Sequence, residues 1–346
     1  MPHNIVEEDV DSVLKLVDLS WFKDKKVLIT GASGMIGYYL LECLTAAIHK
    51  GFGPSEIWVV SKTGVFPDEI SKDIQIKISN IDLCDSQSIN KLPNFDAILH
   101  AGGYAQPVIF LADPLATISV NTTATILLIK KLNPGGKFLY FSSSEIYSGS
   151  TTTPFREDDI GRTNTNHPRS AYIEGKRCGE AIVNSAKKQL GIDATSIRVS
   201  LVYGPGTKSK DKRVLCQIID QAIESQKIRL LDSGNAIRTY CYVSDAVRLA
   251  FVAMLRGTES VYNVGGISKI SISGLAEMIA EITNSKVTVG ESPNQLKGAP
   301  DDVKLDLTKI LKLANDENFI NLRTGLTRTI HWIQSIIEQN RKLDMK

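Results

Sequence analysis

Short apolar runs alternate with longer amphipathic stretches through the first two hundred residues of this 346-residue chain. The runs have the length of strands and occupy residues 26–30, 56–60, 74–79, 97–101, 137–141 and 194–198. The stretches between them have the length and the apolar spacing of helices. Because strands that alternate with helices form sheets covered on both faces, the pattern predicts an α/β fold with a doubly wound parallel sheet.

The alternation becomes irregular after Gly204. We expect a helix near residues 214–225, a strand near 228–231, and helices near 272–283 and 327–340. The predicted organisation is an N-terminal extension (1–24), a sheet domain (25–204) and a smaller C-terminal substrate-binding lobe that makes up most of 205–346. We expect the last two parts to interleave in sequence. Residues 10–17 predict a helix that packs on the body or on a neighbouring subunit.

A glycine-rich segment follows the first predicted strand and precedes a predicted helix. It reads Gly31-Ala-Ser-Gly34-Met-Ile-Gly37, with the spacing GxxGxxG. Glycines let the backbone approach a pyrophosphate, and the N–H groups and dipole at the start of a helix favour its negative charge. The segment therefore predicts the dinucleotide-binding turn of a Rossmann fold, with a purely structural turn as the alternative.

Tyr172 and Lys176 lie four positions apart at the start of another predicted helix, and therefore on one helix face. A phenol has an ordinary pKa of about 10 and is a poor base at neutral pH unless a cation favours the phenolate. Lys176 and the positive ring of an oxidised nicotinamide are suitable cations. The pair predicts proton transfer to or from a hydroxyl, with a coincidental surface pair as the alternative.

The predicted strand at residues 137–141 ends in Ser142-Ser143-Ser144-Glu145. Open α/β sheets bind their ligands at the carboxyl edge of the strands. We therefore expect Ser143 to hydrogen-bond the same substrate oxygen that Tyr172 deprotonates.

The charge and the longest apolar runs exclude several classes of protein. A net charge of +2 gives no reason to expect binding to nucleic acid or to a membrane surface. No run approaches the roughly 20 apolar residues that span a bilayer, and the acidic N-terminal segment is not typical of a signal peptide. We expect a cytoplasmic enzyme.

The cysteines and one histidine have no metal-site spacing. We expect free, buried thiols and no metal from the five cysteines, which are Cys43, Cys84, Cys178, Cys216 and Cys241. His100 ends a predicted strand and has no partner histidine nearby. We expect it to be a structural residue that lines the cofactor cleft, with catalysis as the alternative.

Further segments occur in the order that they have in one known family. They are Asp82-Leu83, Leu99-His-Ala-Gly-Gly103, Asn121, Arg198-Val-Ser-Leu-Val-Tyr-Gly-Pro205, Arg238-Thr-Tyr-Cys-Tyr-Val-Ser-Asp245 and Tyr262-Asn-Val-Gly-Gly266. With them the chain resembles, from about Lys25 to about Lys312, the extended short-chain dehydrogenase/reductases that act on nucleotide sugars as epimerases, dehydratases and decarboxylases. Within that family it looks most like the UDP-glucuronate decarboxylases.

The resemblance implies a nucleotide-sugar substrate, a bound NAD, and a homodimer formed through helices near Asn121 and Tyr172. It implies cofactor contacts from Gly31, Ser33, Gly34, Met35, Ile36, Gly37, Ser61, Lys62, Asp82, Leu83, Ala101, Gly102, Asn121, Tyr172 and Lys176. The second predicted strand ends in Ser61-Lys62, without the acid that holds the ribose of NAD. Lys62 therefore either meets the 2′-phosphate of NADP or is solvated; NAD is preferred because redox-neutral members of the family retain it.

The resemblance also implies oxidation of the sugar at C4, with Tyr172 as the base. Dehydratases then resemble Thr-Asp-Glu after the strand and decarboxylases resemble Thr-Ser-Glu, whereas epimerases need no extra acid. This chain has Ser143-Ser144-Glu145. The predicted catalytic set is Ser143, Ser144, Glu145, Tyr172 and Lys176, and decarboxylation is favoured. The alternatives are a 4-epimerase, a 4,6-dehydratase, an NADPH-dependent 4-keto-sugar reductase and a non-catalytic dinucleotide-binding protein.

Three basic residues are predicted to bind the substrate. Arg238 is the first choice for the diphosphate because its planar fork suits phosphate oxygens, and Arg213 is the second. Lys304 stands where relatives often place an arginine, and Leu201 stands where many have an asparagine.

Overall fold

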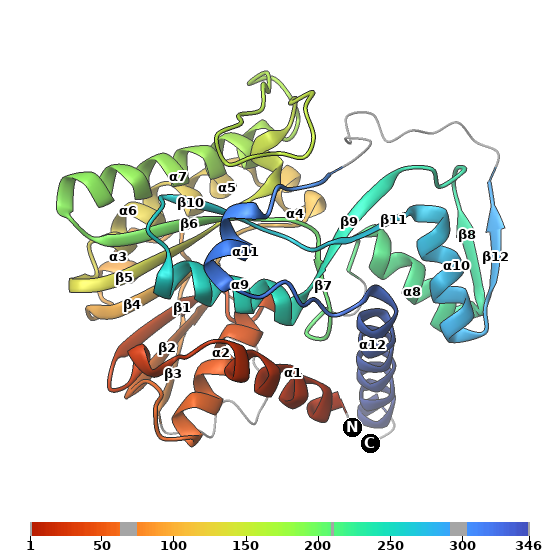
Figure 1. Cartoon of the computed structure of the whole chain (residues 1–346), viewed down its shortest axis with the longest axis horizontal. Coiled ribbons are helices and arrows are strands. Elements are labelled where there is room, and N and C mark those ends of the chain that lie inside the picture. The colour runs from red at the N-terminus through yellow and green to blue at the C-terminus, as the bar shows by residue number, and fades with distance from the viewer. Residues whose placement is uncertain (1, 63–74, 209–210, 291–302, 345–346) are drawn as a thin grey trace.

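The computed structural model describes residues 2–62, 75–208, 211–290 and 303–344 and is built around a seven-stranded sheet (Figure 1). Across the sheet the order is β10 (Val261–Val264), β6 (Asp193–Val199), β5 (Leu132–Ser143), β4 (Phe95–His100), β1 (Lys26–Thr30), β2 (Glu56–Ser61) and β3 (Ile76–Asn80). Every neighbouring pair runs parallel. The predicted doubly wound parallel sheet is confirmed. The run predicted to begin at residue 74 starts outside the described residues.

Helices cover both faces of this sheet (Figure 1). One face carries α3 (Ser86–Asn90), α4 (Pro107–Ala112), α5 (Pro114–Asn121), α6 (Thr123–Ile129) and α7 (Ser170–Leu190). The other face carries α1 (Pro2–Leu16), α2 (Met35–His49) and α9 (Val243–Arg256). A hydrophobic core lies on each face of the sheet, and successive residues of one strand point into opposite cores. In β1, Leu28 packs against the helices of the first face, whereas Val27 and Ile29 pack against those of the other.

A smaller lobe adjoins the sheet domain on the right of Figure 1. Its elements are β7 (Val202–Tyr203), α8 (Val214–Ser225), β8 (Lys227–Leu230), β9 (Ile237–Tyr242), β11 (Ser268–Ser271), α10 (Ile272–Thr283) and β12 (Lys286–Val289). Two C-terminal helices follow, α11 (Thr308–Ala314) and α12 (Leu322–Asp344). The helices expected at 214–225 and 272–283 have the predicted bounds. Because β10 and α9 belong to the sheet domain but follow residue 204, the two parts interleave in sequence.

The order of the strands reverses between β1 and β4. Chain segments leaving these two neighbouring strands turn to opposite faces of the sheet, and a crevice forms between their carboxyl ends. At this edge Gly31 follows β1 and Ala101 follows β4. The topology therefore places the glycine segment where open α/β sheets bind ligands.

The N-terminal helix α1 is anchored by a buried carboxylate. Asp9, only 1% exposed, accepts hydrogen bonds from the hydroxyls of Tyr39 on α2 (2.8 Å) and Tyr242 on β9 (2.7 Å). Its second oxygen pairs with Arg328 on α12. Burial raises the pKa of Asp9, and these three partners oppose that shift. One side chain thus joins the extension, the sheet domain and the last helix. This contact favours packing on the body over packing on another subunit.

The predicted thiols are free, but not all are buried. Cys43, Cys216 and Cys241 are buried, whereas Cys84 and Cys178 are exposed. The expectation of uniform burial was wrong because these two residues stand on polar surface faces of a loop and of α7. Among the described residues, no helix is long and apolar enough to cross a membrane.

Replacing Asp9 by alanine should lower the free energy of unfolding by about 3–5 kcal/mol, because two buried hydroxyls and a guanidinium lose their acceptor. Urea denaturation of the purified variant measures this. Glu8→Ala is the matched control: Glu8 also pairs with Arg328, at 3.3 Å, but is 64% exposed, and its loss should cost less than about 1 kcal/mol. Equal effects of the two changes would contradict the anchoring role.

Candidate active site

The turn after β1 is built to approach another backbone closely. Gly31 has a φ of +73°, and a Cβ there would lie 2.7 Å from the Cα of Gly102. A Cβ on Gly37, inside α2, would lie 2.2 Å from the carbonyl oxygen of Gly31. Gly34 is the N-cap of α2. Only glycine fits the first and third positions. The helix start is thereby brought to the crevice, as pyrophosphate binding requires.

Two adjoining cavities follow the crevice and share Gly103. The first, of about 230 Å³, lies beyond the ends of β1, β2 and β3, and the second, of about 220 Å³, lies towards β5 and α7. Predicted cofactor residues that line the first are Gly31, Ser33, Ser61, Lys62, Asp82, Leu83 and Gly102. Those that line the second are Met35, Ile36, Ala101, Tyr172 and Lys176. Such a pair of cavities around a glycine turn fits the two halves of a nicotinamide dinucleotide.

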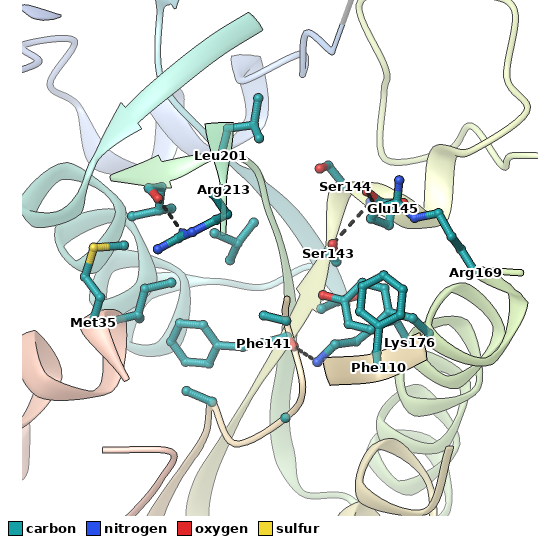
Figure 2. Close-up of a pocket in the computed structure, with 18 residues that line it drawn as sticks. Met35, Phe110, Phe141, Ser143, Ser144, Glu145, Arg169, Lys176, Leu201 and Arg213 are labelled. Carbon is teal, nitrogen blue, oxygen red and sulfur yellow. Dashed lines mark hydrogen bonds and ion pairs between the residues drawn. The ribbon is translucent and has the colours of Figure 1, made fainter. Parts of the chain in front are cut away.

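The second cavity also holds the whole predicted catalytic set. Ser143 ends β5, Ser144 and Glu145 begin the short helix η3 (Ser144–Tyr147), and Tyr172 and Lys176 lie on one face of α7. Figure 2 shows Ser144, Glu145 and Phe110 on one side of this cavity and Met35, Leu201 and Arg213 on the other. Residues about 30 positions apart in the sequence therefore converge on one space.

Tyr172 is held from two directions. Its ring stacks on Phe110 of α4, with centroids 4.7 Å apart and planes 12° from parallel. A hydrogen bond with Ser143 lowers the pKa of the phenol, but burial outweighs this and raises the pKa to about 12. Tyr172 is therefore protonated at neutral pH and needs a further cation nearby to act as a base.

Lys176 is a buried ammonium group placed beside this phenol. Its Nζ donates to the carbonyl oxygen of Phe141 at 2.7 Å and lies 5.9 Å from the centre of the Tyr172 ring. Burial lowers the pKa of Lys176 to about 7. A Cβ on Gly103 would lie 3.6 Å from the same Nζ. The glycine keeps space open next to the ammonium group.

Glu145 pairs with an arginine that the sequence analysis did not select. Arg169 Nη2 donates to Glu145 Oε1 at 2.5 Å, and its guanidinium lies over the Phe110 ring, 5.6 Å from the centroid. Burial raises the pKa of Glu145, and the charge of Arg169 opposes that shift. Glu145 thus holds its proton to a higher pH than an ordinary glutamic acid. Arg169, Phe110 and Tyr172 form one stack beside it.

His100 supports the glycine turns and does not line either cavity. Its Nε2 lies 3.3 Å from the carbonyl oxygen of Val120, so Nε2 is the donor and Nδ1 accepts from the Thr30 hydroxyl at 2.8 Å. Thr30 in turn accepts from the N–H of Gly102 at 2.9 Å. Burial lowers the pKa of His100 to about 3, so the ring stays neutral. The expected structural role fits, but the expected place in the cleft was wrong.

Asn121 also lies outside both cavities. Its amide nitrogen donates to Thr117 O at 2.8 Å, and its oxygen accepts from the Tyr140 hydroxyl at 3.0 Å. The side chain therefore links α5 to β5. The predicted cofactor contact of Asn121 stays a prediction; its Oδ1 would lie 3.9 Å from a Cβ on Gly103, which lines both cavities.

The three predicted substrate residues are not brought together. Arg213 lines the catalytic cavity, paired with Asp211 at 2.8 Å. Arg238 lies on β9 and donates to the carbonyl oxygen of Ile237. Lys304 is exposed and lines a separate groove beside α11. Leu201 does line the catalytic cavity and has a φ of +35°, a conformation that costs leucine more than asparagine.

Sequence reasoning missed Phe110, Arg169, Gly103, Tyr104 and Lys208, which all line the two cavities. One signal was available for Arg169, because it lies three positions before Tyr172 and so shares its helix face. Lys208 and Phe110 had no such signal, since a loop and a short helix bring them to the site.

The fold, the glycine turn and the Ser-Tyr-Lys constellation define a dinucleotide-dependent enzyme. The chain belongs to the family described as "NAD dependent epimerase/dehydratase family", whose model matches residues 27–265. The prediction of this family, and with it of NAD as the cofactor, is confirmed.

Named relatives differ in their reactions. UDP-glucuronic acid decarboxylase 1 of Xenopus tropicalis is 28% identical over 319 residues, which cover 91% of this chain and 73% of the relative. A dTDP-4-dehydro-6-deoxy-D-allose reductase of a Streptomyces species is 25% identical over 318 residues, covering 89% and 96%. An epimerase structure from Methanothermobacter thermautotrophicus has a TM-score of 0.79 at 21% identity, covering 95% and 97%, and shows the shared fold.

Arg169→Gln should raise the pKa of Glu145 further, because the neighbouring cation is lost while burial remains. The ¹³C chemical shift of the labelled Glu145 carboxyl, followed against pH and assigned with Glu145→Gln, measures this. Arg323→Gln is the control, since Arg323 pairs with Glu281 at the surface of α12 and lines neither cavity. An unchanged titration in Arg169→Gln would show that the ion pair does not tune Glu145.

Proposed function

We propose that this protein modifies a nucleotide sugar by oxidising it at C4 with bound NAD, decarboxylating the 4-keto acid, and restoring the cofactor. The observation that carries the proposal is the convergence of Glu145 with Ser143, Tyr172 and Lys176 in one cavity, with a serine at position 144. A dehydratase would need an acid there for the departing hydroxyl, and a plain epimerase has no need of Glu145. The decarboxylase relatives support the same reaction.

The charge of the cavity favours an acidic substrate. Among the described residues that line it, Arg169, Lys176 and Arg213 are basic and Glu145 is the one acid. A nucleotide diphosphate and a glucuronate carboxylate both meet this excess of positive charge. Arg213 is a candidate for the diphosphate, although Asp211 already engages its guanidinium.

Tyr172 and Ser143 perform the proton transfer in this proposal. The Ser143 hydroxyl and the Tyr172 phenol both contact the C4 hydroxyl, and Tyr172 accepts its proton. When bound, NAD supplies the hydride acceptor and a positively charged ring. Lys176, whose own pKa burial lowers to about 7, adds a second positive charge beside the phenol in its protonated form, and that form favours the phenolate over the buried phenol, whose pKa is about 12.

Glu145 acts after the oxidation. A carboxylate that is β to the new C4 ketone leaves as carbon dioxide, and its electron pair moves into an enolate between C5 and C4. In this proposal Glu145 protonates C5 and then takes up a proton from solvent; burial raises the pKa of Glu145 and so favours its protonated form, which the pairing with Arg169 opposes. The ketone is then reduced again, and Tyr172 returns its proton to the C4 oxygen.

Incubation with UDP-glucuronate in D₂O, without added reductant, should give a product that has lost carbon dioxide and carries one deuterium at C5. Mass spectrometry and NMR measure both changes. Nucleotide glucoses are tested in the same way: loss of water would indicate dehydration, and an isomer of unchanged mass would indicate epimerisation.

Tyr172→Phe should abolish turnover and still bind the cofactor. Full activity in that variant would overturn the proton-transfer role.

Reduction of a 4-keto nucleotide sugar is a second candidate, favoured by the reductase relatives and by Lys62 at the end of β2. Cofactor consumption distinguishes the two reactions: the reductase consumes NADPH in proportion to product, whereas the decarboxylase needs no added reductant. A UDP-glucuronate reaction that proceeds without reductant excludes it for that substrate.

We further propose a homodimer through the layer of α4, α5 and α6. Large apolar side chains on its surface are exposed at Val108, Ile109, Leu111, Leu115, Ile118 and Ile126, more than single scattered residues explain. Light scattering after size exclusion should give twice the 37.9 kDa of the chain. Leu115→Glu, at a side chain 78% exposed, should shift the protein to monomer. Leu231→Glu, 77% exposed in the smaller lobe, is the control.

A further inference from the structure

A buried carboxylate outside the predicted catalytic set lies one helical turn after Lys176. Glu180 follows Tyr172 and Lys176 at intervals of four residues, so the three side chains share one face of α7. This face meets the sheet at Ser142 of β5 and Arg198 of β6, which are register partners on neighbouring strands. Glu180, whose side chain is 14% exposed, therefore adjoins both the lysine and the end of β5.

Hydrogen bonds from both strands fix the position of this carboxylate. Ser142, which lines the catalytic cavity, donates from Oγ to Glu180 Oε1. Arg198 donates from Nη2 to Oε2 at 2.9 Å, and from Nε to Oε1 at 3.1 Å and to Oε2 at 3.2 Å. The guanidinium is itself held, because its Nη1 donates to the Tyr147 hydroxyl at 2.7 Å. Charge-assisted donors of this kind bind a carboxylate in its ionised form. Glu180 is thus a negative charge held one turn from Lys176.

Lys176 depends on a negative charge nearby for the role proposed above. Burial lowers its pKa to about 7, and only the protonated amine favours the phenolate. Two ionisable groups that face it from the sheet are neutral: the Tyr140 ring of β5, whose centre lies 5.0 Å from Nζ, and His100 of β4. Glu145 lines the same cavity but pairs with Arg169.

Among the described residues, Glu180 supplies the charge that opposes the effect of burial on Lys176. We infer that Glu180 is a positioning residue of the catalytic site, whose carboxylate keeps the Lys176 amine protonated and thereby favours the phenolate of Tyr172. Through Ser142 the same carboxylate also ties α7 to the end of β5. The inference rests on the proton-transfer role given to Tyr172 and Lys176 in the proposed function, but not on which reaction follows the oxidation.

The titration of Lys176 tests the inference without any substrate. Full-length protein is labelled with lysine that carries ¹³C at Cε, and the Lys176 resonance is assigned with Lys176→Arg and followed against pH. The amine is protonated below its pKa and neutral above it. Because Glu180→Gln removes the anion, the midpoint should move from about 7 to lower pH. An unchanged midpoint would overturn the inference.

Two controls separate the charge of Glu180 from other effects of the change. Glu174→Gln removes a negative charge from the same helix, at a side chain that is 39% exposed and pairs with Arg177, and should leave the midpoint of Lys176 unchanged. Ser142→Ala removes a hydrogen bond to Glu180 but keeps its charge, and should also leave the midpoint unchanged. A shift in either control as large as that in Glu180→Gln would contradict the assignment of the effect to the charge of Glu180.

The pH dependence of turnover is a second readout, which a purely structural role would not move. With UDP-glucuronate as substrate, the ratio of wild-type to Glu180→Gln kcat should rise about threefold or more between pH 6 and pH 8.5, because the variant loses the protonated amine at lower pH. The same ratio at both pH values would overturn the inference. A wild-type protein that does not turn over UDP-glucuronate would count against the proposed function alone, and the titration of Lys176 then decides the inference.

Glu180→Gln leaves the guanidinium of Arg198 without its carboxylate, a change that destabilises folded proteins. The double variant Glu180→Gln/Arg198→Gln removes both charges, so it keeps the test available where the single variant does not fold. The midpoint of Lys176 should again move to lower pH, because the charge that opposes burial comes from Glu180. An unchanged midpoint in the folded double variant would overturn the inference.

Discussion

The backbone that leaves β1 lies directly against the backbone that leaves β4, and the site depends on this contact. Gly31 and Gly102 meet there with no room for a Cβ at Gly31. A chain of buried hydrogen bonds holds the approach in place: His100 orients the Thr30 hydroxyl, which accepts from the N–H of Gly102. The strand order reverses between β1 and β4, so a crevice forms beyond the carboxyl ends of these two strands. Both cavities lie along this crevice.

Burial is the second constraint, and it acts on every group that would transfer a proton. It raises the pKa values of Tyr172 and Glu145 and lowers that of Lys176. Each group is thereby moved toward its neutral form. Local partners then decide how far each shift goes: Ser143 favours the phenolate of Tyr172, and Arg169 favours the carboxylate of Glu145. The cavity is therefore sensitive to any charge that enters it, which suits a site whose chemistry begins when a charged cofactor is bound.

The two adjoining cavities differ in how their lining residues are connected to the packed core of the molecule. The catalytic end is tied to the packed layer of α4 and α7 through the stack of Arg169, Phe110 and Tyr172. The other cavity is lined by the exposed side chains of Lys62 and Lys208, by Ser33 of the glycine turn, and by Ser61, which is buried at the end of β2.

The sequence by itself determined the sheet, the glycine turn, and the pairing of Tyr172 with Lys176, because these follow from local periodicity and from spacing along one element. It also supplied the order Ser143-Ser144-Glu145, on which the proposed reaction depends. Only the tertiary structure decided that Arg169 pairs with Glu145, that Phe110 stacks on Tyr172, and that Lys208 reaches the cavity of Lys62. It also decided that His100 and Asn121 support the site from behind, and that Lys304 faces another groove. These contacts join segments far apart in the chain or depend on which way a loop side chain turns, and neither is encoded in a local pattern of hydrophobic and polar residues.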